Sequence, residues 1–128
     1  MRRLLPLALL VLAPSVQATS FICQLESYMT GARTLAFDTE KRTARYIDAM
    51  NAEYSGQITL ARRHGDGTKF NLMFQFPSET YGLHGVEYVL FPTGPGAFQV
   101  IGVGFAIVNG TRYATQLISN SPATCLGL

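Results

Sequence analysis

Few side chains of this sequence could do acid–base or metal chemistry. Its two histidines, His64 and His84, each lie next to a glycine in a segment that we predict to be a turn or loop. Neither has another His or Cys at metal-ligand spacing, and a zinc site needs three or four convergent ligands. His64 and Asp66 are an i, i+2 pair within one turn, which is typical of a solvent-facing turn. The sequence therefore predicts no metal site and no cofactor.

Motifs that mark catalysis are also missing from the sequence. It has no Gly-x-Ser-x-Gly elbow, no His-Glu-x-x-His, no phosphate-binding glycine loop and no Cys-x-x-Cys. A triad or a carboxylate pair assembled from distant residues stays open, because such sites are recognised by geometry rather than by spacing. We expect a non-enzymatic binding module, with a hydrolase as the less favoured alternative.

One candidate recognition segment is the predicted loop from Pro77 to Gly85. It presents Tyr81, Leu83 and His84, and loops on a rigid β scaffold often carry recognition. The alternative interpretation is a connecting loop with one apolar residue tucked beneath it.

A second candidate is a basic patch formed by Arg62 and Arg63, which Lys41, Arg42 and Arg45 could extend. Such a patch would suit an anionic partner. The alternative is a charged strand edge, which discourages pairing with another chain.

The first eighteen residues resemble a secretory signal peptide. Arg2 and Arg3 form a basic start, Leu4–Ala13 form a short apolar run, and Val16-Gln17-Ala18 is a small-residue cleavage signal. The apolar run is shorter than the roughly 20 residues that span a bilayer. We therefore expect residues 1–18 to be removed and residues 19–128 to form one periplasmic or extracellular domain without a membrane-inserted segment.

Cleavage of that leader also changes the charge of the protein. Ten basic and eight acidic residues become eight of each once Arg2 and Arg3 are lost, so the mature chain has a formal net charge of zero. A neutral domain gives no electrostatic reason to expect nucleic acid or an anionic membrane as its partner. The expected partner is an unidentified protein or small ligand.

The two cysteines, Cys23 and Cys125, lie near opposite ends of the mature chain. In an exported domain of this size they predict a disulfide, with two free buried thiols as the alternative. A disulfide would make the first and last strands neighbours.

Alternating apolar residues and turn signals predict about eight short strands in an antiparallel barrel, with a β-sandwich as the alternative. The expected strands are 20–25, 34–37, 42–47, 54–62, 69–76, 86–91, 97–108, 111–119 and a short return at 123–126. Residues 38–54 also fit a helix with a stripe of Tyr46, Ile47, Met50 and Tyr54, although a hairpin is favoured. We expect side chains to fill the interior, and the alternative is a barrel that carries a small apolar ligand.

Asn109-Gly110 predicts a two-residue type I′ turn between the longest alternating segments. Counting outward pairs Phe105 with Ala114, and Gly102 with Leu117. The expected core face is Ile101, Val103, Phe105, Ile107, Ala114 and Ile118, with Gln116 on the same face. The glycines of the opposite face predict a bend of the sheet, with close approach of another group as the alternative.

The segments Phe21-Ile22-Cys23 and Thr124-Cys125 give the mature chain a cysteine near each end. This arrangement is similar to that of the small periplasmic inhibitors of lysozyme, which are exported β-barrels. The resemblance implies a barrel fold and an inhibitor-like binding role. The Ser-Gly-x-x-Tyr loop of that family is absent here, so no inhibitory residue is carried over.

Overall fold

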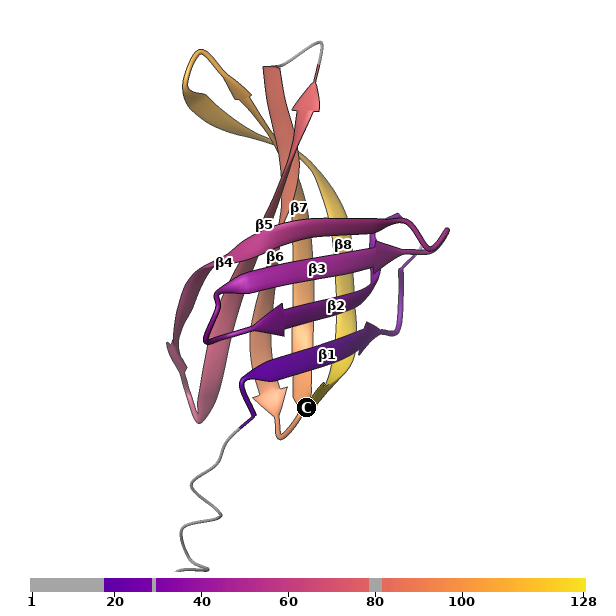
Figure 1. The fold of residues 1–128 in the computed structure, drawn as a ribbon, viewed down its shortest axis with the longest axis vertical. Coiled ribbons are helices and arrows are strands. Elements are labelled where there is room, and N and C mark those ends of the chain that lie inside the picture. Colours follow the sequence, from indigo (N-terminus) through magenta and orange to yellow (C-terminus); the bar gives the residue numbers. More distant parts are fainter. Residues whose placement is uncertain (1–17, 29, 79–81) are drawn as a thin grey trace, which may run out of the picture.

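The computed structural model describes residues 18–28, 30–78 and 82–128, which form a closed antiparallel barrel (Figure 1). The strands are β1 (Ser20–Leu25), β2 (Ala32–Asp38), β3 (Thr43–Asp48), β4 (Glu53–His64), β5 (Gly67–Ser78), β6 (Gly82–Gly94), β7 (Ala97–Val108) and β8 (Thr111–Gly127). Each strand pairs with the next, and β8 pairs with β1 to close the barrel. The predicted barrel is confirmed. The predicted leader lies outside the described residues except for Ala18.

The barrel is closed covalently as well as by hydrogen bonds. Cys23 on β1 lies directly opposite Cys125 on β8, and the two form the predicted disulfide, which is buried. A buried disulfide is compatible with an oxidising, exported location.

Alternating side chains of all eight strands fill the barrel interior. Aromatic rings dominate it: Phe37 packs against Phe70 with centroids 4.8 Å apart, and Tyr46 meets Phe74 edge-on at 4.7 Å. Tyr88 and Phe74 are the largest fully buried side chains. The structure thus agrees with the expected filled core.

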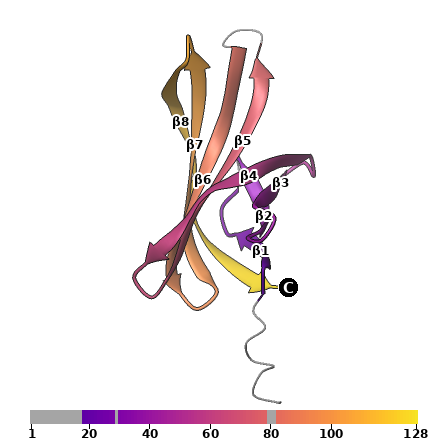
Figure 2. The same cartoon turned by 60° about the vertical axis from the view of Figure 1, so that its left-hand side comes forward.

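Four strands continue beyond the barrel. The strands β5 to β8 have 12 to 17 residues, whereas β1 to β3 have six or seven. Their extra length forms a projecting sheet, defined here as residues 74–78, 82–86, 104–108 and 111–117, which rises above the barrel in Figures 1 and 2. The sheet remains paired across β6 and β7 as far as Leu83 and Ile107.

The predicted loop from Pro77 to Gly85 is wrong for most of its length. Strand β5 runs to Ser78, and β6 begins at Gly82. Residues 79–81, which include Tyr81, lie outside the described residues. The proline and glycines suggested a loop, but Pro77 lies on a stretch of β5 that has no strand on its other side, where proline is tolerated.

Two other boundaries differ from expectation. Strand β6 extends through Pro92 to Gly94, with an irregular register there instead of a longer turn. The expected return strand at 123–126 is the end of β8, because one 17-residue strand crosses from the projecting sheet into the barrel wall.

The ambiguous segment 38–54 is a hairpin, and no part of it is helical. The Asp38 carboxylate accepts hydrogen bonds from the backbone N–H groups of Glu40 and Lys41, both at 2.9 Å. These bonds, chiefly the one from Lys41, hold the pKa of Asp38 below its ordinary value. An Asx-type turn therefore replaces the helix start that Asp38 also suggested.

The Asn109-Gly110 turn has positive φ at both residues, 53° and 81°, as a type I′ turn requires. The predicted register is confirmed near the turn, where Phe105 pairs with Ala114. It is wrong beyond that point, because bulges displace the pairing and Gly102 meets Ser119 instead of Leu117.

The predicted core face of β7 is also wrong, although Phe105 on that face is buried, at 2% exposed. Val100, Gly102, Gly104 and Ala106 face the interior and are buried, while Ile101, Val103 and Ile107 are half-buried on the outside. The glycine face lies inward because core side chains approach its backbone closely. A Cβ on Gly102 would lie 2.6 Å from the Tyr88 ring. Gln116 is exposed and needs no buried partner.

Gly110→Val should loosen the tip of the β7–β8 hairpin. A β-branched residue at a φ of 81° costs about 1–2 kcal/mol, and the tip has no packing to offset that strain. We expect amide hydrogen exchange at Thr111 and Val108 to accelerate roughly tenfold. Gly110→Asn, which tolerates positive φ, is the control; equal exchange in all three proteins would contradict a type I′ turn.

Candidate functional site

A candidate site is a groove of about 400 Å³ where the projecting sheet leaves the barrel. We call it the mouth groove. Its walls come from β3, β5, β6, β7 and β8 and from the β1–β2 connection. The lining residues include Thr30, Phe76, His84, Ala106, Thr115 and Gln116. Strands from both halves of the chain therefore build it together.

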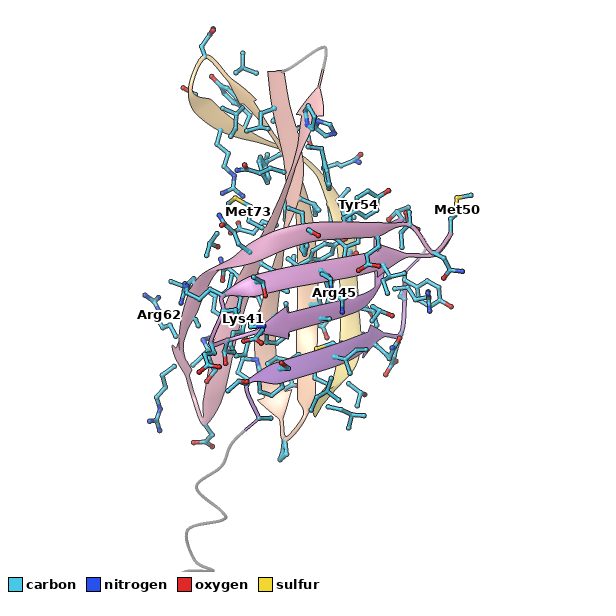
Figure 3. The ribbon with its side chains drawn as sticks, in the orientation of Figure 1. Lys41, Arg45, Met50, Tyr54, Arg62 and Met73 are labelled. Carbon is cyan, nitrogen blue, oxygen red and sulfur yellow. A yellow bond between two sulfur atoms is a disulfide. The ribbon has the colours of Figure 1, made fainter. Side chains whose placement is uncertain are left out.

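The rings of Tyr46, Phe76 and Tyr88 form the floor of the mouth groove, and Tyr54 packs behind them. Tyr46 stacks on Tyr54 at 4.6 Å, Tyr54 meets Phe76 at 5.3 Å, and Phe76 faces His84 at 5.7 Å. Tyr54 is labelled in Figure 3 on the upper side of the barrel. This row of rings offers an apolar surface at the base of the groove.

The two tyrosines of the floor are uncharged at ordinary pH. Burial raises the pKa of Tyr46 well above its usual value and raises the pKa of Tyr88 as well. The Tyr88 hydroxyl also accepts a 2.9 Å hydrogen bond from the backbone N–H of Ala32. The floor is therefore a neutral surface, suited to neutral or apolar ligand groups.

His84 supplies the polar group of the mouth groove. It lies on β6 opposite Phe76 on one side and Ala106 on the other, and its Nδ1 atom is buried with no hydrogen-bond partner among the described residues. An unpaired buried nitrogen costs free energy, because its bond to water is lost without replacement. Because that atom is inaccessible in this conformation, a ligand recovers the loss only when the His84 ring turns to present a nitrogen to the groove.

Only one of the three predicted recognition residues can be assigned to the groove. His84 lines the groove from strand β6. Leu83 lies on the opposite face of β6, where it pairs with Pro77, and Tyr81 lies outside the described residues. Sequence reasoning found His84 but missed Phe76 and Gln116, which β5 and β8 bring to it from distant parts of the chain.

The predicted basic patch is only partly assembled. Arg45 forms an ion pair with Glu53, and Arg42 bonds to the carbonyl of Ile58 at 3.3 Å. Figure 3 shows Arg62 and Lys41 on the side of the barrel where β3 begins. Arg62 and Arg63 are exposed and form no ion pair with a described residue.

A polar network on the outer face of β5 to β8 was not predicted. Arg112 on β8 bonds to Glu87 at 2.9 Å and lies 4.3 Å above the Phe105 ring. Glu87 also accepts a 3.3 Å bond from Asn71 on β5. The network ties four strands together, so we assign these charges a structural role.

The second histidine has no share in this site. His64 ends β4 at the opposite end of the barrel, is exposed, and lies 5.7 Å from Phe91. Within residues 18–28, 30–78 and 82–128, no three His, Cys, Asp or Glu side chains gather as a metal site. The same residues include no helix long and apolar enough to cross a membrane.

Comparison with protein-family models, with curated proteins and with solved structures finds no match to this chain.

Proposed function

We propose that the protein is a non-enzymatic, exported binding module and that the mouth groove is its binding site. The observation that carries this proposal is the unpaired, buried Nδ1 atom of His84 beside an aromatic floor. Ligand sites are usually apolar hollows of this size with a few convergent polar groups. The leader-like N-terminus and the disulfide support export.

The groove favours a ligand group of definite chemistry. Phe76 and the neutral tyrosines suit an aromatic ring or a branched apolar group, while His84 and Gln116 can form hydrogen bonds at its edge. Such a group can belong to a protein side chain or to a small molecule. The packed barrel interior counts against the alternative of an apolar ligand carried within the barrel.

An aromatic probe tests the site directly. We expect 8-anilinonaphthalene-1-sulfonate, which joins aromatic rings to a hydrogen-bond acceptor, to bind at one saturable site with enhanced fluorescence. Thr115→Phe fills the groove from an exposed position and should weaken binding at least about tenfold, since it removes most of the apolar contact. His84→Phe keeps the ring packing but removes the nitrogens, and should weaken binding about threefold to tenfold.

The matched control is His64→Phe, the same change at the other end of the barrel, which should leave the affinity unaltered. Binding that is unsaturable, or that survives both groove substitutions unchanged, would rule out the mouth groove as the site.

A further inference from the structure

His84 is the side chain through which acid can charge the mouth groove. The described lining of the groove includes no Asp, Glu, Lys or Arg, and its tyrosines are Tyr46 and Tyr88. Burial raises the pKa of both tyrosines, so they stay uncharged. Histidine is the residue type that ordinarily becomes charged between about pH 8 and pH 5. The charge of the groove near neutral pH therefore depends on His84.

The side chains around His84 bring no charge of their own. Phe76 on β5 and Ala106 on β7 flank it in the sheet. The β1–β2 connection contributes Thr30, and β8 contributes Thr115 and Gln116. All of these are uncharged, so a protonated His84 finds no counter-charge among them.

One carboxylate approaches the aromatic floor from the β3 side, but its own turn holds it. Asp48 Oδ2 accepts a 3.4 Å hydrogen bond from the Tyr54 hydroxyl. Its Oδ1 accepts two 2.9 Å hydrogen bonds from the backbone N–H groups of Met50 and Ala52. Figure 3 shows Met50 at the outer end of this turn. Asp48 therefore serves the β3–β4 turn and is not free to pair with His84.

The charged pair of β6 and β8 lies on the other face of the sheet. His84 and Glu87 are an i, i+3 pair on a stretch of β6 with uninterrupted register, so they point to opposite faces. Glu87 bonds to Arg112 at 2.9 Å and to Asn71 at 3.3 Å. These charges satisfy each other on the outer face.

We propose that the mouth groove is selective for small aromatic acids and that His84 determines this selectivity. The inference rests on the mouth groove being the binding site. The ring of the ligand lies on the aromatic floor, and its anionic group pairs with protonated His84. Small Ala106 beside His84 leaves the imidazole space to turn toward the groove, and the exposed Gln116 amide can donate a second hydrogen bond.

This pairing couples ligand binding to proton binding. An anion binds the protonated form of His84 more tightly, because a hydrogen bond between charged groups is roughly twice as strong as one between neutral groups. By linkage, the affinity for an anionic ligand rises as the pH falls. A neutral ligand of the same shape gains nothing from the added charge.

Two fluorescent dyes with the same rings test the selectivity. The dye 8-anilinonaphthalene-1-sulfonate is anionic, and N-phenyl-1-naphthylamine has the same ring system without the sulfonate. From about pH 8 to about pH 5.5, we expect the disulfide-bonded protein to bind the sulfonate dye about fivefold to tenfold more tightly. Its affinity for the neutral dye should change less than about twofold.

The variants His84→Gln and His84→Phe remove the titratable ring, and each should bind the sulfonate dye with an affinity that does not depend on pH. The matched control is His64→Phe. Because the chain has two histidines, this change removes the same charge from the far end of the barrel and should keep the native pH dependence. Near-ultraviolet circular dichroism at both pH values checks that each variant is folded.

Three results would overturn the selectivity and leave the groove itself as a binding site. These are a sulfonate-dye affinity that does not change with pH, a gain that the neutral dye shares, and a gain that persists in a folded His84 variant. A different result would remove the proposed function as well: both dyes binding Thr115→Phe as tightly as the native protein at both pH values.

Discussion

Reduction of the Cys23–Cys125 disulfide is expected to lower the melting temperature by about 20–30 °C. The two cysteines are 102 residues apart, so the bond closes a loop that includes nearly the whole described chain. On the chain-entropy model, such a loop is worth about 4–5 kcal/mol, and each kcal/mol shifts the melting temperature of a domain this size by roughly 4–8 °C. The bond also joins β1 to β8, the contact that closes the barrel.

Circular dichroism melting with and without a phosphine reductant measures this effect. The variant Cys23→Ala with Cys125→Ala is the control: it should melt at the lower temperature whether or not reductant is present. Equal melting temperatures for the oxidised and reduced native protein would show that hydrogen bonding and packing alone close the barrel.

The features that sequence reasoning predicted correctly depend on local patterns or on covalent chemistry. Alternation identifies most strands, Asn109-Gly110 identifies its own turn, and the two cysteines predict the disulfide that joins β1 to β8. These signals were sufficient for the fold class and for placing the first and last strands side by side.

The errors concern which face of a strand is buried, a property that depends on distant residues. Alternation on β7 distinguishes two faces but does not say which one meets the core, and large side chains made the wrong face attractive. The bulges of β8 give no sequence signal of their own, because Thr115 and Ile118 are ordinary strand residues. The mouth groove was equally hidden, since Phe76, His84 and Gln116 meet only after the barrel closes.

Gly102 tests the corrected assignment of the faces. Its position on β7 faces the fully buried Tyr88, and an added Cβ would lie 2.6 Å and 2.8 Å from two carbons of that ring. The ring cannot withdraw, because Phe74 and Tyr46 pack against it at centroid distances of 6.0 Å and 5.6 Å. We therefore expect Gly102→Ala to destabilise the protein by about 2–3 kcal/mol, within the range for overpacked cores.

Gly104→Ala is the matched control, because it makes the same change two residues along the same face of β7. Its Cβ would meet Thr115 Oγ1 at 2.8 Å, and Thr115 is an exposed side chain that can rotate away. Urea unfolding should therefore give a small change in the free energy of unfolding for Gly104→Ala and a large one for Gly102→Ala. If the glycines instead served only to bend the sheet, the two substitutions would cost similar amounts, since both would restrict the backbone in the same way. A clear difference between them would show that β7 carries Gly102 to make room for Tyr88. The Tyr88 hydroxyl in turn accepts a hydrogen bond from the backbone N–H of Ala32 at the start of β2.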